Sequence, residues 1–161
     1  MQNKEIEILP PTAEELEAIA QIETLSGLSN WGTESYKYEL QKKESLFFIA
    51  RSEGKVIGFV FARLIKPEIE ILNIAILPEL RKQGVGRKLF EKILELAEQI
   101  GCSECWLEVR ESNLVAQRFY EKLGFQNIGR RKNYYQFPVE DAFLLNFKIG
   151  NKSCLKKKFE L

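Results

Sequence analysis

Residues 81–94 read RKQGVGRKLFEKIL, and this stretch decides how the rest of the chain is interpreted. Gly84 and Gly86 lie one residue apart between basic side chains. An apolar stripe at helical spacing follows, formed by Leu89, Phe90, Ile93, Leu94, Ala97 and Ile100. Exposed backbone N–H groups and the positive end of a helix dipole both favour an anion. The stretch therefore predicts an anion-binding loop at the start of a helix that ends before Gly101.

Other phosphate loops match this stretch less well. A P-loop needs G-x-x-x-x-G-K-[ST], and both that spacing and the hydroxyl are missing here. A dinucleotide fingerprint needs G-x-G-x-x-G, but position 89 is Leu, although Glu108 lies about twenty residues further on, where a ribose-binding acid is expected. What remains is Q-x-G-x-G-R/K, and a plain glycine turn with surface basic residues stays open as an alternative.

Composition limits the class of protein. The chain has 161 residues, 45% apolar and 29% charged, with a net charge of +1. This predicts one globular domain over residues 1–149 and a short basic tail over 150–161, with no direct contact to nucleic acid or membrane. The chain contains no histidine, which excludes Ser-His-Asp and Cys-His catalysis and histidine metal sites. Its three cysteines and polar start predict a cytoplasmic protein without a disulfide framework.

The hydrophobic pattern predicts a mixed α/β fold. An edge strand at 4–9 and a helix opened by the Thr12–Glu15 capping box come first, and a helix at 33–43 follows. Two apolar strands at 45–52 and 56–65 form a hairpin, and a third strand covers 68–77. After the glycine helix come a strand at 104–111, a short helix capped by Asn113, a loop rich in Arg and Tyr, and a last strand at 141–149. The sheet is expected to be mostly antiparallel, with helices on both faces and one parallel crossover from 68–77 to 104–111.

Several polar features are expected to meet at one edge of this sheet. Ligands of open α/β sheets gather at the carboxyl ends of parallel strands. The glycine loop follows one such end, Glu108 and Arg110 lie near the next, and Asn113 begins the helix after it. This convergence favours a ligand over a chance turn.

The residues that carry these features resemble a known family. NIAILPELRKQGVGRKLFEKILELA resembles the coenzyme A signature of the GNAT N-acetyltransferases. WLEVRESN, FYEKLGF and RRKNYY resemble the bacterial ribosomal-protein-alanine N-acetyltransferase branch. The resemblance is dense from about Leu72 to Asp141. It implies the GNAT fold, acetyl-CoA as co-substrate without a metal, and a protein N-terminus as acceptor, namely an N-terminal alanine of a small-subunit ribosomal protein.

The resemblance also implies roles for individual residues. Glu108 would be the general base and Tyr120 the general acid. Trp31, Tyr134 and Tyr135 would line a groove for the acceptor peptide. Asn113 would bond the pantetheine arm, and coenzyme A would otherwise be held by Ile74, Ala75, Ile76, Lys82, Gln83, Gly84, Val85, Gly86 and Arg87.

The chemistry suits these residue types. A protein N-terminal amine has a pKa of roughly 8, against roughly 10.4 for Lys, so it is the easier nucleophile near neutral pH. Alternation along the strand puts Trp106, Glu108 and Arg110 on one face, where Trp and partial burial could raise the pKa of Glu108. Tyr120 follows Asn113 by about two helical turns and could protonate the departing thiolate.

Simpler interpretations stay open for each residue. Glu108 could be a salt-bridged residue, for instance with Arg110, and Tyr120 could serve only the core. The Arg- and Tyr-rich loop could be an ordinary hairpin, and Cys102 and Cys105 are expected to be core residues rather than metal ligands. Trp31 is flanked by Asn30 and Gly32, where relatives carry Pro and Ser. A GNAT enzyme for a lysine or a small amine and a non-catalytic coenzyme A-binding module are the alternative functions, and a monomer or weak dimer is expected.

Overall fold

The computed structural model describes residues 4–28 and 31–150, and the chain folds into two compact units. The first unit comprises Met1–Leu64 and Ile71–Leu96, and the second comprises Ile65–Glu70 and Ala97–Leu161. The one-domain organisation expected for residues 1–149 stays a prediction, and the predicted tail lies outside the described residues except for Gly150. Within the described residues, no helix is long and apolar enough to cross a membrane.

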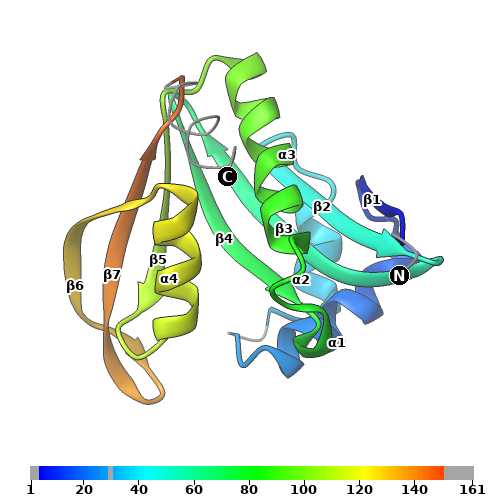
Figure 1. The fold of residues 1–161 in the computed structure, drawn as a ribbon, viewed down its shortest axis with the longest axis horizontal. Coiled ribbons are helices and arrows are strands. Elements are labelled where there is room, and N and C mark those ends of the chain that lie inside the picture. Colours follow the sequence, from blue (N-terminus) through cyan, green and yellow to red (C-terminus); the bar gives the residue numbers. More distant parts are fainter. Residues whose placement is uncertain (1–3, 29–30, 151–161) are drawn as a thin grey trace. The chain divides into compact units, whose positions relative to one another are not determined.

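The first unit contains most of the predicted helices and strands (Figure 1). Its elements, in chain order, are β1 (Ile6–Leu9), α1 (Leu16–Leu25), α2 (Gly32–Glu39), β2 (Ser45–Ser52), β3 (Lys55–Ile65), β4 (Glu68–Ile76) and α3 (Val85–Ile100). The strand order is β1-β2-β3-β4, and the pairs β1–β2 and β2–β3 are antiparallel. Strand β1 lies at the end of this order, which confirms the predicted edge strand.

Alternation along β2 and β3 gives the first unit apolar residues on both faces of its sheet. Phe47 pairs with Phe61 and Ile49 pairs with Phe59, and these four side chains pack against α1 and α2. Phe48 points the other way, toward α3, where the ammonium of Lys92 lies 5.8 Å from its ring centroid. A sheet buried on both faces explains why these strands are almost continuously apolar.

Helix α1 begins as predicted. Thr12 and Glu15 form a capping box, with the Thr12 N–H donating to Glu15 Oε2 at 2.8 Å. The segment Ala13–Glu15 is a 3-10 turn, and the α-helix proper follows it. Gly27, with φ of 66°, takes the left-handed conformation that ends this helix.

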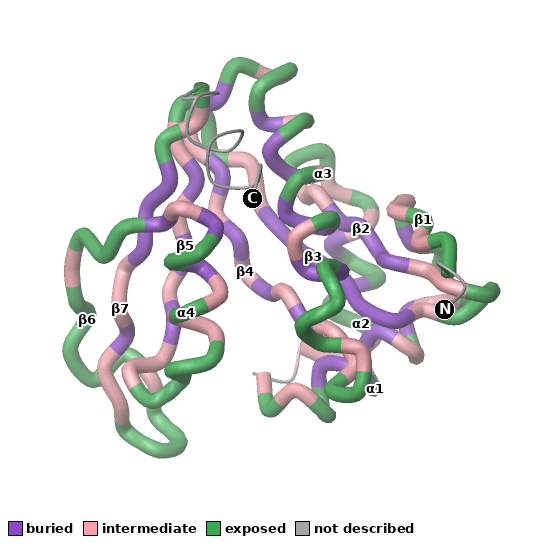
Figure 2. The backbone as a smooth tube through the Cα atoms, viewed as in Figure 1, coloured by how far each residue is buried: buried purple, intermediate pink, exposed green. Residues whose placement is uncertain are grey.

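The second unit is an antiparallel hairpin packed beside one strand and one helix (Figure 1). Its elements are β5 (Glu104–Arg110), α4 (Leu114–Leu123), β6 (Gln126–Gln136) and β7 (Val139–Lys148), with strand order β5-β7-β6. Figure 2 shows most of β6 as exposed, which agrees with its place at the end of this order. Apolar positions of β5 alternate with partly exposed ones, so Trp106, Glu108 and Arg110 share one face as predicted.

Two predicted boundaries are wrong. Helix α2 ends at Glu39 instead of reaching residue 43, because the chain turns there and the Lys42 N–H donates to the Glu39 carbonyl at 3.0 Å. The expected loop rich in Arg and Tyr is strand β6, which pairs with β7 up to a tight turn at Phe137–Pro138. The hairpin alternative for this segment is therefore correct. The predicted parallel pairing of β4 with β5 concerns residues of both units and stays a prediction.

Candidate active site

The glycine loop of the first unit has the backbone of an anion cradle. Lys82 has φ of 61° and Gly84 has φ of 83°, so the chain is left-handed at both positions before α3 begins at Val85. The first helical hydrogen bond runs from the Lys88 N–H to the Gly84 carbonyl at 3.1 Å. The N–H groups of a helix's first turn have no partner within the helix, so they are available to an anion at its N-terminus.

Two side chains hold the segment between β4 and this loop. Arg81 Nε donates to the Ile76 carbonyl at 3.1 Å, and its Nη2 donates to Ser26 Oγ at 3.3 Å. Gln83 Nε2 donates to the Glu79 carbonyl at 3.3 Å. Gln83 was predicted to touch the ligand, whereas Arg81 was not among the predicted site residues. The position of Arg81 at the start of the stretch 81–94, directly before Lys82, was the signal in the sequence that could have identified it.

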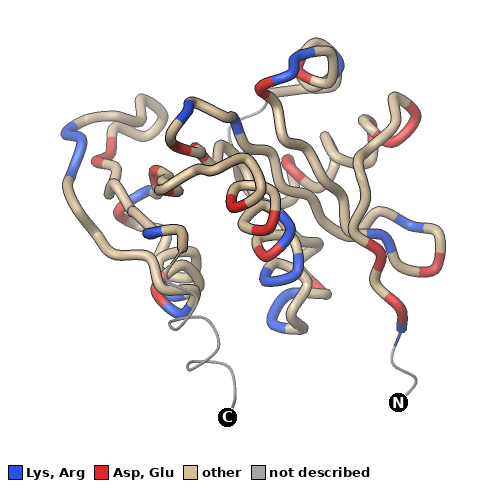
Figure 3. Tube along the Cα trace, turned by 90° about the horizontal axis from the view of Figure 1, so that it is seen from above, with Lys and Arg blue, Asp and Glu red and all other residues tan. Residues whose placement is uncertain are grey.

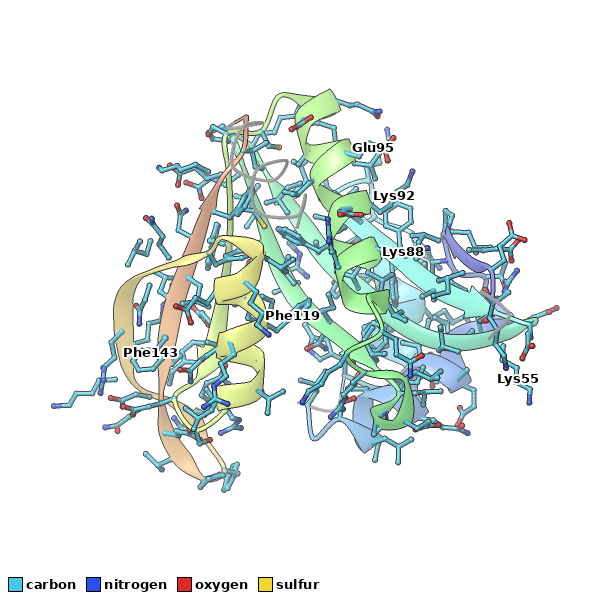
Figure 4. All side chains as sticks on the ribbon, viewed as in Figure 1. Lys55, Lys88, Lys92, Glu95, Phe119 and Phe143 are labelled. Atoms are coloured by element: carbon cyan, nitrogen blue, oxygen red, sulfur yellow. The ribbon has the colours of Figure 1, made fainter. Side chains whose placement is uncertain are left out.

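The basic residues around the loop differ in what they already contact. Arg87 Nε is paired with Glu91 Oε1 at 2.8 Å, while Lys82 and Lys88 are exposed. Lys88, Lys92 and Glu95 lie along α3, where Lys92 and Glu95 approach to 3.4 Å (Figure 4). Over the residues that the structure describes, positive and negative segments are interspersed (Figure 3). Positive charge near the loop is therefore local, as expected for a small anionic ligand.

Strand β4 leads into the loop with alternating side chains. Ala75 is buried in the core with α1 and α2, while Ile74 and Ile76 are half-buried on the opposite face. A Cβ on Gly58 would lie 2.6 Å from Ile76 Cδ1 and 2.9 Å from the Ala75 carbonyl oxygen. Gly58 therefore lets β3 approach β4 closely at the strand end that carries the predicted acetyl-binding residues, and it was missed because nothing in the sequence shows this approach.

In the second unit, Asn113 begins α4. Its Oδ1 accepts a hydrogen bond from the Ala116 N–H at 3.1 Å, which confirms the predicted N-cap. Gly124, with φ of 107°, ends the helix, and its N–H donates to the Tyr120 carbonyl at 3.1 Å. The cap uses the side-chain oxygen of Asn113 and not its NH2 group, so this residue still has donors for a ligand.

Glu108 lies at the centre of the polar cluster in the second unit. Its Oε1 is 2.9 Å from Arg131 Nε, and its side chain is 9% exposed. The phenol of Tyr134 is also hydrogen-bonded to Glu108, and this bond raises the pKa of Tyr134 to about 12. The alternative interpretation, in which Glu108 is salt-bridged, is therefore correct, but its partner is Arg131. Arg110, which was the expected partner, pairs with Glu140 at 3.3 Å.

Tyr120 and Tyr135 continue this cluster. Tyr120 is buried, and its ring lies 5.5 Å from that of Phe125, so the core role predicted as an alternative is real. Burial, with smaller contributions from Cys105 and Tyr135, raises the pKa of Tyr120 above its ordinary value. Tyr135 lies 5.1 Å from the ring of Tyr134 and 4.0 Å from the Arg110 guanidinium. Burial, followed by the charge of Glu108, raises the pKa of Tyr135.

The turn before Asn113 is bound to the β6–β7 hairpin. Glu140 accepts a hydrogen bond from Arg110 Nη1 and one from the backbone N–H of Ser112. Hydrogen bonds from Ser112 and then from Arg110 lower the pKa of Glu140. Asp141 accepts a bond from the Asn133 N–H at 2.8 Å, which fixes the left-handed Asn133 in the bulge of β6. The hairpin and the start of α4 are therefore one connected polar structure.

Trp31 is half-buried and packs against the core of the first unit. Its ring stacks on Tyr36 at 5.8 Å and meets Phe61 edge-on at 5.2 Å. Its backbone N–H donates to Glu23, a carboxylate that is fully buried and whose Oε2 has no partner among the described residues. The predicted wall for a peptide, with Trp31 on one side and Tyr134 and Tyr135 on the other, stays a prediction. Glu23 was missed, although its place on the apolar stripe of α1 was a readable signal.

The two cysteines of the C-x-x-C pattern are core residues. Cys102 and Cys105 are both buried and unpaired. Burial raises the pKa of each thiol, which makes both poor nucleophiles and poor ligands at neutral pH. Among the described residues, no group of three or more Cys, Asp or Glu side chains could hold a metal ion.

Comparison with known proteins agrees with this arrangement. The model of the acetyltransferase (GNAT) family matches residues 16–125. The Escherichia coli (strain K12) [ribosomal protein bS18]-alanine N-acetyltransferase is 34% identical over 138 residues, covering 84% of this chain and 93% of that one. The crystal structure of the E. coli ribosomal-protein-S18-alanine N-acetyltransferase has a TM-score of 0.80 and 31% identity, covering 90% and 94% of the two chains.

A more distant structure shows the fold alone. The PaiA N-acetyltransferase of Thermoplasma acidophilum, solved in complex with coenzyme A, has a TM-score of 0.74 and 23% identity over 89% of this chain and 99% of that one.

The family model covers well over half of the chain, and the E. coli relative matches over nearly its full length. The chain belongs to the acetyltransferase (GNAT) family, whose members transfer the acetyl group of acetyl-CoA.

Proposed function

We propose that this protein transfers the acetyl group of acetyl-CoA to the N-terminal α-amino group of a protein, and that the acceptor is the N-terminal alanine of a small-subunit ribosomal protein. Two findings support this acceptor: the names of the E. coli relatives and the share of their length that matches. The observation that carries the chemistry is the position of Glu108, a nearly buried carboxylate held by Arg131 and Tyr134.

The first unit supplies the anion site for coenzyme A. The left-handed Lys82 and Gly84 and the N-terminus of α3 suit a pyrophosphate, since they offer N–H groups and positive charge together. Gln83, Val85, Gly86 and Arg87 complete the loop. The backbone of Ile74, Ala75 and Ile76 is assigned to the pantetheine and acetyl end, where an N–H would bind the developing oxyanion.

The second unit supplies the acid and the base. Glu108 accepts a proton from the acceptor ammonium, directly or through a water, and releases the neutral amine that attacks the thioester carbon. Tyr120 gives its proton to the sulfur as the carbon–sulfur bond breaks. The attacking nitrogen still carries one extra proton after the new bond forms, and its loss to the Tyr120 phenolate leaves a neutral amide and restores the phenol. Burial raises the pKa of Tyr120, so the phenol carries its proton over the whole neutral range, although it is a weaker acid than an exposed tyrosine. Asn113 is assigned to the pantetheine amides through its side-chain NH2 group.

The exposed β6–β7 turn separates peptide acceptors from small amines. The side chains of Tyr134, Phe137 and Val139 around the β6–β7 turn are exposed at 45%, 92% and 63%. An exposed apolar turn suits a peptide better than a small polycation such as a polyamine, which needs an acidic pocket. A lysine side chain within a peptide is therefore the alternative acceptor to test.

Initial rates on matched acceptors test the proposal. One peptide begins with a free Ala and contains no Lys, a second has the same sequence with a blocked N-terminus and one Lys, and a polyamine is the third acceptor. The proposal expects transfer to the first peptide at a rate about 10²-fold or more above the others, because the α-amine is far more deprotonated near neutral pH. Faster transfer to the blocked peptide would make the protein a lysine acetyltransferase. Coenzyme A binding without transfer to any acceptor would make it a binding module.

A further inference from the structure

The neighbouring residues Arg130 and Arg131 of β6 each form an ion pair and each lie beside an aromatic ring, but their partners differ. The side chains of Arg130 and Arg131 are both 50% exposed, and both are ion-paired. The Arg130 guanidinium lies 5.0 Å from the ring of Phe143, which Figure 4 labels, and pairs with Glu111 and Asp141 at 3.1 Å each. The Arg131 guanidinium lies 5.5 Å from the ring of Tyr134 and pairs with Glu108. Only Arg131 of this pair contacts the proposed base.

The contact between Arg131 and Glu108 crosses a whole strand. In the sheet order, β7 lies between β5 and β6, so the backbones of Glu108 and Arg131 are about 10 Å apart. The β7 residue paired with Arg131 is Ala142, which pairs on its other side with Arg110. Because Ala142 ends at its Cβ, it leaves room for the Arg131 side chain to reach over β7.

The bulge of β6 brings Tyr134 to the same carboxylate. Arg131 pairs with Ala142 and Tyr135 pairs with Glu140, so β6 has two more residues than β7 over this stretch. The bulge is fixed by the left-handed Asn133 and its hydrogen bond to Asp141. It places the Tyr134 ring 5.5 Å from the Arg131 guanidinium, and it brings the phenol close enough to Glu108 for that carboxylate to raise the pKa of Tyr134. Arg131 thus contacts both Glu108 and Tyr134.

We propose that Arg131 is a positioning residue of the transfer reaction: it acts through Glu108, whose carboxylate it keeps in one orientation together with Tyr134. This inference rests on the proposed function, in which Glu108 takes the proton of the acceptor amine. A glutamate has several rotatable bonds, and a base must lie within hydrogen-bond reach of the proton that it abstracts. An ion pair made through Nε, with the Tyr134 ring beside the guanidinium, would fix the carboxylate before the substrate arrives.

No other cation of the cluster can take over this task. Arg110 is paired with Glu140 and lies against the ring of Tyr135. Arg130 is paired with Glu111 and Asp141. The strand residue opposite Glu108 on β7 is Leu144, which is apolar. Loss of the Arg131 guanidinium would therefore free Glu108 to rotate away from Tyr134.

Tyr134 reports the orientation of Glu108 without any need for catalysis. The hydrogen bond with Glu108 raises the pKa of Tyr134 to about 12, whereas the charge of Arg131 acts in the opposite direction. If Arg131→Met leaves Glu108 in place, only the lowering charge is lost and the pKa of Tyr134 rises further. If Glu108 moves away, the pKa falls toward the ordinary value near 10. The two outcomes differ in sign.

The experiment titrates the tyrosines by NMR with ring-labelled tyrosine. The chain has five tyrosines, and Tyr134→Phe assigns the signal. The proposal expects a fall in the pKa of Tyr134 in Arg131→Met and in Glu108→Gln, and no change in Arg130→Met. An unchanged or higher pKa of Tyr134 in Arg131→Met would overturn the proposal, because Glu108 would then stay in place without Arg131.

Kinetics on the free-Ala peptide supply the second readout. Arg131→Met should lower kcat by about 10-fold or more and leave the KM for acetyl-CoA unchanged, with partial recovery in Arg131→Lys. Arg130→Met should retain kcat within about twofold. Equal losses in Arg130→Met and Arg131→Met would reduce Arg131 to a structural role and overturn the proposal. Absence of transfer by the unmodified protein would refute the proposed function, while the titration would still decide whether Arg131 positions Glu108.

Discussion

Asn113 Oδ1 accepts a hydrogen bond from the backbone N–H of Ala116 at 3.1 Å, and this bond caps the first turn of α4. Asn113 is also the residue proposed to bind the pantetheine arm of coenzyme A. We propose that the two polar atoms of this amide have separate tasks. The oxygen caps the helix, and the NH2 group is assigned to the ligand. Because the tasks belong to different atoms, two substitutions can separate them.

Asn113→Asp should keep the cap and lose the ligand donor. A carboxylate accepts the Ala116 N–H as well as an amide oxygen does, so stability should hold. The KM for acetyl-CoA should nevertheless rise several-fold, because an NH2 donor has become an acceptor. Asn113→Ala should raise the KM and also lower the free energy of unfolding by about 1 kcal/mol. An unchanged KM in Asn113→Asp would remove this residue from the proposed site.

Glu108→Gln tests the base. The amide retains the size of the side chain and can still accept from Arg131, but it cannot take a proton. Turnover should fall by about 10²-fold or more, with coenzyme A binding unchanged by calorimetry. Turnover near that of the unmodified protein would mean that another group, or the solvent, accepts the proton.

Tyr120→Phe tests the acid and has a pH-dependent signature in stability. The phenol is buried, so the unfolded chain releases its proton more easily than the folded one. Above about pH 10 the folded state holds more protons, and the free energy of unfolding falls as the pH rises. Urea titrations at about pH 9 and pH 11 should show a smaller fall in Tyr120→Phe than in the unmodified protein. Turnover in Tyr120→Phe should drop by about 10-fold or more, and an unaffected turnover would restrict Tyr120 to the core.

Gly84→Ala tests the anion loop against a matched control. Gly84 and Gly27 both have positive φ, at 83° and 66°, and a Cβ at either would meet no atom within 4 Å. An Ala at either position should cost about 1 kcal/mol of backbone strain. Only Gly84→Ala should weaken coenzyme A binding, by several-fold in calorimetry. Equal binding by both variants would indicate that the loop backbone does not contact the ligand.

Glu39→Gln tests the acid stability of the first unit. Burial alone would raise the pKa of Glu39, but hydrogen bonds from Ser45 and Lys42 and the charge of Arg63 outweigh it, and the pKa is lowered from 4.5. Its contribution is therefore present above about pH 4.5 and is lost as the pH falls further. Glu39→Gln should lower the free energy of unfolding by about 1–3 kcal/mol at neutral pH, and less at about pH 3. Glu34→Gln, on the exposed side of α2, should change it little at either pH.

The sequence contained enough to place the elements but not the contacts between side chains far apart in the chain. The capping box of Thr12 and Glu15, the N-cap at Asn113 and the shared face of Trp106, Glu108 and Arg110 all depend on residues a few positions apart, and all three are present. The pair of Glu108 with Arg131 depends on the strand order β5-β7-β6 and on the small Ala142 between them. The same holds for Gly58, which is required only because Ile76 lies against it. Neither relationship has a local signal in the sequence.

The β6 segment shows how a turn-like composition misleads. Residues 130–136 are rich in charged and polar side chains, which indicated a loop. In the structure they form the strand at the end of the order β5-β7-β6, where one side of the backbone faces solvent and charged residues are favoured. The bulge between Arg131 and Tyr135 then directs the two tyrosines toward the cluster of Glu108.

The most direct test uses one peptide that offers both kinds of amine. It begins with a free alanine, contains a single internal lysine, and is incubated with the protein and acetyl-CoA before fragmentation by mass spectrometry. With the unmodified protein, we expect one added acetyl group on the N-terminal fragment of the peptide. With Glu108→Gln, we expect the yield of this product to be strongly reduced. An acetyl group on the lysine fragment, or a yield that Glu108→Gln does not change, would contradict the proposed function.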